Sequence, residues 1–232
     1  MNWNTSTALA RDGRSARWDR HRQDRRVVLV RAARAAVHEL GPTASMDEIA
    51  AHAGTSKSVF YRYFGDRAGL RQAVAERVTA SMERRLREAA VDAPDGVSAL
   101  HRMVAECLSV AASSPAVYAF AVTQGGAADG TGPDLGPFFE RIAALLAEGL
   151  ARTLPAADAG PGTTLVLWPR VAVGTVRAAV EAWLATEESV RPDPVRTAHD
   201  VAGWLLAGLR SADPSASPAA DTHTPTQQGE PS

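Results

Sequence analysis

One stretch constrains the fold of this chain more than any other: residues 43–64, TASMDEIAAHAGTSKSVFYRYF. Ser45, followed three residues later by Glu48, has the sequence of a capping box and predicts a helix that begins at about Met46. Gly54 can take a positive φ where this first helix ends and the chain turns. The stretch therefore predicts two short helices joined by a tight glycine turn.

The second helix of this pair is predicted to begin after Ser56, its N-cap, and to run from Lys57 to Phe64. Phe60 and Phe64 share a face that can be buried against neighbouring helices. The other side chains point elsewhere and offer ammonium, hydroxyl and aromatic groups, which suit phosphate oxygens, base edges and thymine methyl groups. The pattern favours a helix-turn-helix that enters the major groove of DNA, and a surface helical hairpin is the alternative. The outward side chains are Lys57, Ser58, Val59, Tyr61 and Tyr63.

A resemblance to a known family supports the DNA-binding interpretation. Residues 54–70, GTSKSVFYRYFGDRAGL, resemble the recognition segment of the TetR family of transcriptional regulators. Phe60 replaces the leucine usual in that family, and Tyr63 replaces the usual histidine. The resemblance implies that Arg67 takes the place of a lysine that grips a phosphate at the start of the next helix. The matching residues are Gly54, Ser56, Lys57, Tyr61, Arg62, Phe64 and Leu70.

The predicted partner of this segment is a double-stranded DNA operator. We expect the contacts to come from the two helix starts and from the outward face of the second helix. The predicted DNA-binding residues are Ser45, Ser56, Lys57, Ser58, Val59, Tyr61, Tyr63 and Arg67.

The charge of the chain is distributed unevenly. The net charge of the 232 residues is only −1, which by itself argues against a nucleic-acid-binding protein. Residues 1–90, however, contain 17 Lys and Arg against 10 Asp and Glu, a net of +7, which leaves −8 for residues 91–232. This asymmetry indicates a basic DNA-facing module joined to an acidic module that stays off the phosphates.

The periodicity of the chain predicts an all-α fold. The resemblance implies that this fold consists of an N-terminal three-helix DNA-binding domain with a helix-turn-helix and a larger C-terminal helical domain for ligand binding and dimerisation. A flexible basic arm is expected at 1–20, the helix-turn-helix domain at 21–66, the larger domain at 67–212 and a disordered tail at 213–232. The arm is either a solvated leader or a helix near DNA that places Arg11, Arg14, Arg17 and Arg20 along one side.

Further helices are expected on both sides of residue 66. The first runs from about 20 to 40, and the long helix that Asp66 caps runs to about 90. The others are expected at 97–112, from Pro115 through Phe120, at 135–154, at 164–186 with Pro169 as a kink or a new start, and at 194–210. Loops are expected at 125–133 and 155–162.

The last two predicted helices carry broad apolar stripes that include Val176, Trp183, Val201 and Trp204. Two such helices from each of two chains would form a four-helix bundle across a two-fold axis, as the resemblance implies. The sequence thus predicts a homodimer through these helices, although the same residues are also compatible with an ordinary core.

The larger domain is expected to bind a small hydrophobic ligand, such as an acyl or lipid-like molecule. Large apolar side chains recur on the inner faces of its helices, and few charged residues accompany them. The candidates for holding a polar group of the ligand are Arg102, Glu106, Arg141 and Arg177. Each of these apolar residues is also compatible with plain core packing. The predicted ligand-binding residues are Met103, Cys107, Tyr118, Phe120, Phe138, Phe139, Ile142 and Trp168.

Patterns that would indicate an enzyme, a cofactor or a metal site are absent from the sequence. The six histidines are scattered without metal-ligand spacing, and neither a phosphate-binding glycine loop nor a nucleophile elbow occurs. Cys107 is the single cysteine, which fits a reducing compartment. No uninterrupted apolar segment is long enough for a membrane span. We therefore expect a cytoplasmic, non-enzymatic protein without cofactor, metal or membrane partner.

Together these patterns predict a ligand-responsive, sequence-specific DNA-binding regulator, and the resemblance implies a repressor that binds a palindromic operator as a homodimer. The alternative is a helical small-molecule-binding or scaffold protein with little sequence-specific DNA binding.

Overall fold

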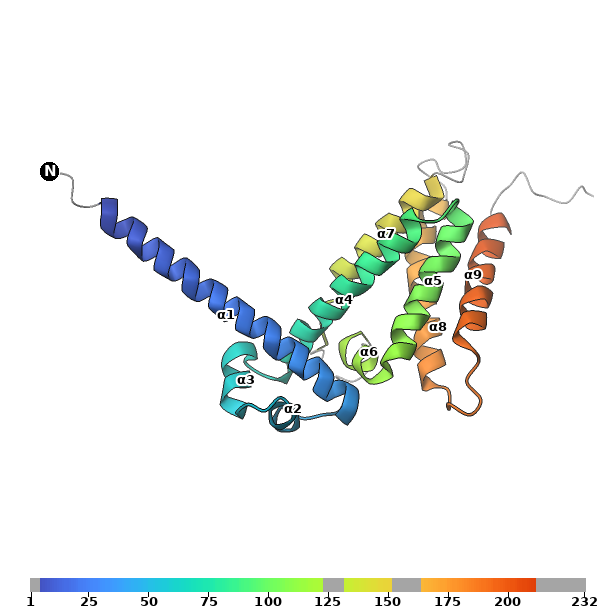
Figure 1. Cartoon of the computed structure of the whole chain (residues 1–232). Coiled ribbons are helices and arrows are strands. Elements are labelled where there is room, and N and C mark those ends of the chain that lie inside the picture. The colour runs from blue at the N-terminus through green and yellow to red at the C-terminus, as the bar shows by residue number, and fades with distance from the viewer. Residues whose placement is uncertain (1–4, 123–131, 152–163, 212–232) are drawn as a thin grey trace, which may run out of the picture.

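The computed structural model describes residues 5–122, 132–151 and 164–211. Within these ranges the chain forms α-helices and one short 3₁₀ segment (Figure 1). The predicted all-α class is therefore confirmed for the described residues. The predictions for the loop at 125–131, the linker at 155–162 and the tail at 213–232 lie outside them.

The N-terminal part consists of α1 (Thr5–Leu40), α2 (Met46–His52) and α3 (Lys57–Phe64). The last three turns of α1 bury an apolar face against α2 and α4, whereas its N-terminal half projects away from the body of the molecule (Figure 1). Helix α1 begins 15 residues before the expected start near residue 20. The segment contains no proline, and its alanines and arginines have high helix propensity, so the helix continues without an apolar stripe. The structure does not describe the side chains of Arg11, Arg14 and Arg17.

Helix α4 (Arg67–Val91) starts immediately after the helix-turn-helix and runs the length of the molecule. The Asp66 carboxylate accepts a hydrogen bond from the Gly69 amide at 2.8 Å, which confirms the predicted cap. A Cβ atom at Gly69 would overlap the carbonyl oxygen of Phe64. Glycine at this position therefore allows α3 and α4 to cross closely.

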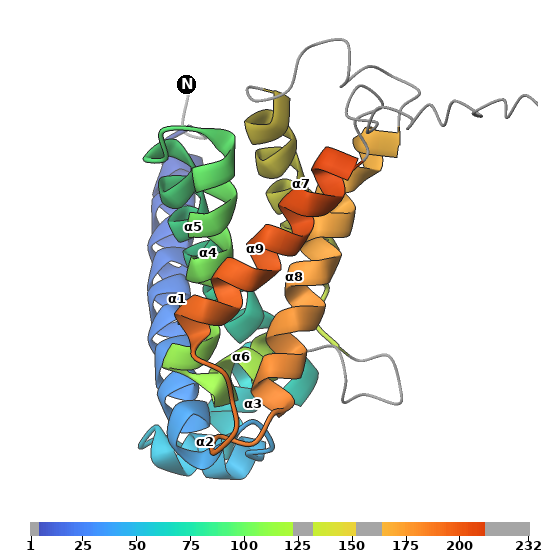
Figure 2. The same cartoon turned by 90° about the vertical axis from the view of Figure 1, so that its right-hand side faces the viewer.

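The C-terminal part contains α5 (Gly96–Ser113), α6 (Pro115–Ala121), α7 (Gly136–Ala151), the 3₁₀ segment η1 (Thr164–Leu167), α8 (Trp168–Ala185) and α9 (Pro194–Ser211). Helix α5 packs between α4 and α9, and α7 packs against α4 and α8. Figure 2 shows α9 crossing the α5 and α8 layer obliquely. Pro169 is the second residue of α8, so the chain starts a new helix there rather than kinking an existing one.

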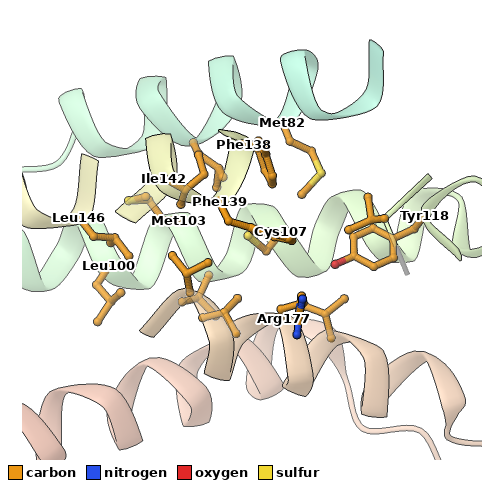
Figure 3. Close-up of a pocket in the computed structure, with 16 residues that line it drawn as sticks. Met82, Leu100, Met103, Cys107, Tyr118, Phe138, Phe139, Ile142, Leu146 and Arg177 are labelled. Atoms are coloured by element: carbon orange, nitrogen blue, oxygen red, sulfur yellow. The ribbon is translucent and has the colours of Figure 1, made fainter. Parts of the chain in front are cut away.

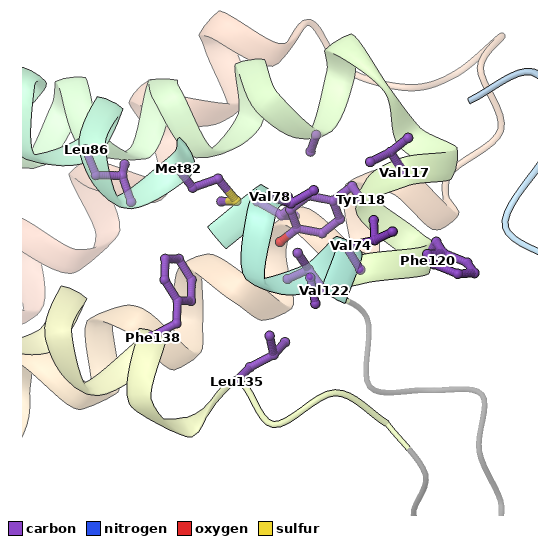
Figure 4. Packing of buried hydrophobic residues seen from close by; sticks show 14 of the residues in the cluster. Val74, Val78, Met82, Leu86, Val117, Tyr118, Phe120, Val122, Leu135 and Phe138 are labelled. Atoms are coloured by element: carbon purple, nitrogen blue, oxygen red, sulfur yellow. The ribbon is translucent and has the colours of Figure 1, made fainter. Parts of the chain in front are cut away.

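One hydrophobic core connects the two parts. It extends from Leu29 on α1 through Phe60, Val74 and Met103 to Leu206 on α9 without a break. Figure 4 shows the central portion, where α4, α6 and α7 contribute side chains to the same cluster. The proposed domain boundary at 66/67 coincides with the start of α4, and the core continues across it.

Candidate nucleic-acid interface and apolar cavity

Helix α2 begins with the predicted capping box. The Ser45 hydroxyl accepts from the Glu48 amide at 3.3 Å, and the Ser45 amide donates to the Glu48 carboxylate at 2.8 Å. These hydrogen bonds lower the pKa of Glu48 below its ordinary value. The Ser45 hydroxyl, a predicted DNA contact, is therefore engaged in fixing the start of α2.

The turn between α2 and α3 contains the expected glycine. Gly54 has φ of 62°, and α3 covers Lys57 to Phe64 as the sequence predicts. Ser56 is the N-cap residue of α3, but its side chain makes no capping hydrogen bond. Its Oγ atom lies 3.0 Å from Ser58 Oγ instead. The predicted N-cap position of Ser56 is confirmed, and its hydroxyl pairs with a neighbouring hydroxyl rather than with a helix amide.

Helix α3 has one buried and one exposed face. Phe60 and Phe64 are buried in the core with ring centroids 5.6 Å apart. Lys57, Ser58 and Tyr61 are exposed, and the Tyr61 side chain retains 41% of its accessible surface. The exposed face thus carries an ammonium, a hydroxyl and a phenol, which is the chemistry expected of a helix that contacts DNA.

The remaining predicted contacts on α3 are less accessible. Val59 and Tyr63 are half-buried and pack against the core. Lys57 donates a hydrogen bond to Asp47 on α2 at 2.7 Å, which raises the pKa of the ammonium group. Because both partners are exposed, this ion pair can exchange for a phosphate at little cost.

Arg67 bridges the N-terminal segments. Its Nε atom donates to the Ala44 carbonyl at 3.2 Å, and a terminal nitrogen donates to the Pro42 carbonyl at 2.8 Å. The guanidinium group also lies 5.4 Å from the ring centroid of Phe120 on α6. Arg67 therefore ties the loop before α2 to the start of α4 and to α6. The sequence pattern contained no signal for this bridging role.

Arg62 was not among the predicted contacts, although it belongs to the matched motif. Its side chain is exposed at the end of α3, and its guanidinium lies 5.4 Å from the ring centroid of Tyr63. The ring holds the cation beside the exposed face of α3. The position of Arg62 one residue after Tyr61 could have marked it as a candidate.

An apolar cavity lies between α4, α5, α7 and α8 (Figure 3). Six of the eight predicted ligand-binding residues line it: Met103, Cys107, Tyr118, Phe138, Phe139 and Ile142. The space open to a water-sized sphere is about 50 Å³. Small-molecule pockets typically measure about 300–1,000 Å³, so an occupant must displace flexible side chains such as the methionines.

Phe120 and Trp168 do not line this cavity. Phe120 is 2% exposed and lies in the core beneath the Arg67 guanidinium, at the far side of α6 from Phe138 (Figure 4). Trp168 borders a neighbouring hollow with Leu206 and Leu209 of α9. Both were expected to line the cavity because they are large and apolar. That prediction was wrong, because neither side chain points into the cavity.

The cavity is also lined by residues outside the predicted apolar set; of the four charged candidates, Arg177 is the one that lines it. Most of them belong to apolar stripes visible in the sequence, but the stripe does not indicate which members border the free space. Arg177 of α8 is the charged residue among the lining side chains, and its Nε atom is buried without a hydrogen-bond partner. The additional lining residues are Met82, Leu86, Leu100, Val104, Val122, Leu146, Val173, Val176, Arg177 and Val180.

Cys107 is a packing residue in this cavity. Burial raises the pKa of its thiol to about 12, so the thiolate is scarce at neutral pH. Within the described part of the chain, no three His, Cys, Asp or Glu residues are arranged to hold a metal ion. No single described helix could cross a membrane; α5 and α6 pass on length and composition only as a pair, and that pair bends by 105°.

A capped helix pair with an exposed second helix, joined by α4 to a helical body with an apolar cavity, defines a helix-turn-helix transcriptional regulator. The sequence profile of the bacterial regulatory proteins of the tetR family matches residues 29–74. Two HTH-type transcriptional regulators from two strains of Mycobacterium tuberculosis, both described as uncharacterized, are 33% identical over 175 residues, which is 75% of this chain and 74% of each relative. The chain belongs to the tetR family.

Solved structures of transcriptional regulators share the fold. A tetR-family regulator from Streptomyces coelicolor superposes with a TM-score of 0.64 at 19% identity, covering 82% of each chain. The fatty acid degradation regulator FadR from Bacillus halodurans has a TM-score of 0.61 at 19% identity and covers 78% of this chain and 97% of its own. FadR from Bacillus subtilis, solved in complex with stearoyl-CoA, has a TM-score of 0.61 at 17% identity and covers 78% and 98%.

Proposed function

We propose that this regulator is a repressor that binds a palindromic DNA operator as a homodimer and releases it when a hydrophobic ligand with an acyl or lipid-like chain occupies the cavity. The observation that carries the proposal is the position of α4. Its first turn is tied through Arg67 to the loop before α2, and its second half lines the cavity through Met82 and Leu86. A ligand that displaces Met82 would therefore shift the support of the helix-turn-helix.

The exposed face of α3 supports the DNA part of this proposal. Lys57, Ser58 and Tyr61 are exposed on this face. We assign Lys57 and Ser58 to phosphate oxygens, and Tyr61 to base edges or thymine methyl groups. Ser56, Val59, Tyr63 and Arg67 complete the proposed contacts, with Ser45 at the start of α2. Because Val59 and Tyr63 are half-buried, we expect their contribution to be smaller than that of Tyr61.

Apolar residues exposed on the last two helices support the dimer. Val171 of α8 and Val195 and Trp204 of α9 are each more than half exposed, and Trp204 retains 67% of its surface. A Cβ atom added at Gly174 or Gly203 would meet nothing within 4 Å, so these helices leave room for the close approach of a second chain. A two-fold dimer would place two α3 helices about 34–36 Å apart, one turn of DNA.

The lining of the cavity supports a ligand with a long apolar chain. Thirteen of its sixteen lining residues are apolar, and the other three are Cys107, Tyr118 and Arg177. The FadR structure solved with stearoyl-CoA shares this fold. A coupling free energy of about 1–3 kcal/mol between the cavity and α3 would weaken operator binding roughly 5- to 150-fold.

Selection of duplexes from a random DNA pool by the purified protein, at two salt concentrations, tests the DNA part. We expect a palindromic site whose affinity falls steeply as salt rises. Tyr61→Ala should abolish specific binding without unfolding the protein. Val97→Ala on α5, at a residue of nearly the same exposure, is the matched control and should retain binding. If no site is enriched, the chain is instead a helical binding or scaffold protein.

A further inference from the structure

A groove rich in arginine lies at the junction of α1, α4 and the corner between α5 and α6. We call it the basic groove. It offers about 130 Å³ to a water-sized sphere and is lined mainly by polar atoms. Its polar lining residues are Arg34 of α1, Arg77, Ser81 and Arg85 of α4, and Ser113 and Ser114.

The positive charge of the basic groove is largely uncompensated. Among the described residues, Arg34 and Arg77 form no ion pair, and both side chains are exposed. Arg85 pairs with Glu106 of α5 at 2.9 Å. A second hollow continues from the groove along α1, where Arg31 adds another guanidinium. Guanidinium groups from two helices that line one groove are suited to the oxygens of a phosphate. The hydroxyls of the groove are already engaged, Ser114 with His38 Nδ1 at 2.7 Å and Ser113 with the Val110 carbonyl at 2.8 Å, so the arginines are the groups available to the ligand.

The basic groove and the apolar cavity share a wall. Met82 of α4 and Tyr118 of α6 line both. Figure 3 places Tyr118 at one end of the elongated cavity, and Figure 4 shows Met82 close to it. A methionine side chain changes rotamer readily, so a modest movement of Met82 would join the two spaces. The joined space is apolar at one end and cationic at the other.

We infer that the ligand consists of an acyl chain linked to a phosphate-bearing head group, with the chain in the apolar cavity and the phosphate in the basic groove. This inference rests on the proposed function, because it assigns the head group of the same ligand. A free fatty acid carries one negative charge, for which the half-buried Arg177 at the cavity would suffice, although its Nε atom lies 4.0 Å from the Glu181 carboxylate. The several guanidinium groups outside the cavity match the greater charge of phosphates.

A phosphate in the basic groove would also connect the two parts of the molecule. Arg34 lies two turns before the end of α1, which leads directly to α2, whereas Arg77 lies on α4. A head group held by both residues would draw α1 toward α4. This restraint would act on the helix-turn-helix through α1, whereas Arg67 acts on it through the start of α4, and it would let the head group contribute to the proposed release of DNA.

Binding of palmitoyl-CoA, palmitate, palmitoyl lysophosphatidate and coenzyme A to the full chain tests the inference by calorimetry. The wild-type protein should bind palmitoyl-CoA or the lysophosphatidate about 10- to 100-fold more tightly than palmitate, since each charge-assisted contact contributes appreciably. Preference for one of the two phosphate compounds identifies the source of the head group. Equal binding of palmitate would overturn the inference.

The Arg34→Ala, Arg77→Ala double variant should lose most of this preference while its affinity for palmitate changes less than about threefold. The matched control removes two exposed arginines from the same helices outside the groove, Arg20→Ala with Arg84→Ala, and should keep the preference. The Arg34→Lys, Arg77→Lys variant keeps the charge and should retain part of it. An unchanged preference in the alanine variant, with an unchanged melting temperature, contradicts the groove assignment.

Absence of binding by all four compounds has a different meaning. In that case the acyl ligand of the proposed function fails, and the head-group assignment fails with it. Binding of palmitate together with rejection of both phosphate compounds would leave the proposed function standing and overturn only the inference about the basic groove.

Discussion

The Arg67 side chain connects three segments of the N-terminal part. It donates to the carbonyl groups of Pro42 and Ala44 and lies over the ring of Phe120. The resemblance to the TetR family implied a phosphate contact for this residue. In the free protein this guanidinium is bound to two carbonyl groups, which is a structural role. A structural role predicts that its removal lowers stability, whereas a phosphate contact predicts that its removal lowers DNA affinity.

We predict that Arg67→Ala lowers the free energy of unfolding by about 1–3 kcal/mol, because two carbonyl groups lose their donors. Arg67→Lys should recover part of this loss, since one ammonium cannot serve both carbonyls in the same fork geometry. Thermal and urea unfolding check the prediction, with Arg62→Ala as the control that loses only a stacking contact. An unchanged unfolding free energy combined with weaker binding to all DNA sequences would favour the phosphate contact.

Sequence reasoning succeeded at single residues where a side chain acts on its own backbone neighbourhood. The capping box of Ser45 and Glu48, the cap of Asp66 and the positive φ of Gly54 were all confirmed. Such local signals require no knowledge of distant segments. The bridge formed by Arg67 joins residues 23 and 25 positions apart, and only the tertiary fold shows it.

At the scale of helices, α4 is held to α7 by a cluster around Glu83. The Glu83 carboxylate accepts from Arg141 Nε of α7 at 2.7 Å and from a terminal nitrogen of Arg87 at 3.2 Å. The hydrogen bond from Arg141 is the main cause that lowers the pKa of Glu83 below its ordinary value of 4.5, and the charge of Arg141 and the contact with Arg87 lower it further. The cluster fixes α7 against the α4 segment that lines the cavity.

We predict that Glu83→Gln lowers the unfolding free energy by about 1 kcal/mol at neutral pH, because the two arginines lose the negative charge of their acceptor. A carboxylate with a lowered folded-state pKa stabilises the protein above its unfolded-state pKa and loses this contribution as the pH falls through the folded-state pKa. The difference between wild type and variant should therefore shrink below about pH 4.5.

Melting temperatures measured from pH 7 to pH 3 check this prediction. Glu88→Gln serves as the control, because Glu88 lies 3.9 Å from Arg84 in an exposed pair and should contribute less than about 0.5 kcal/mol. A difference between wild type and Glu83→Gln that stays constant over the whole pH range would show that the carboxylate charge is not responsible.

Helix boundaries were predictable where the sequence contains a stop or start signal. Helix α3 has the predicted bounds, and Pro169 starts α8. Helix α1 has no such signal near residue 20, and its N-terminal turns lack an apolar stripe, so its extension to Thr5 was missed. Similarly, apolar stripes identified six lining residues of the cavity but did not exclude Phe120 and Trp168. Periodicity predicts which face of a helix is buried, and it does not predict which other helix or cavity that face meets.

At the scale of the whole molecule, the proposed mechanism depends on a pair of chains. A single α3 helix reads one half-site, and a palindrome requires a second helix related by a two-fold axis. The uneven charge of the chain fits such an assembly. Its basic residues are concentrated in the first 90 residues, so two DNA-binding parts would face the duplex while the acidic parts meet through α8 and α9.

We predict that Trp204→Glu weakens the homodimer by about 2–4 kcal/mol, roughly 30- to 700-fold, because a charge replaces an aromatic side chain at the centre of the proposed interface. Sedimentation at micromolar protein concentration measures the effect directly. Val91→Glu, at the end of α4, introduces the same charge at a residue that is 73% exposed, and it should leave the dimer intact.

The monomeric Trp204→Glu variant should also bind the selected palindrome more weakly, with a salt dependence about half as steep, because only one set of phosphate contacts remains. Its affinity for an isolated half-site should match that of the wild-type protein, since α3 lies far from α9 in the fold (Figure 1). A variant that remains dimeric would place the contact between chains elsewhere on the molecule. A monomeric variant with full affinity for the palindrome would instead separate DNA recognition from dimerisation.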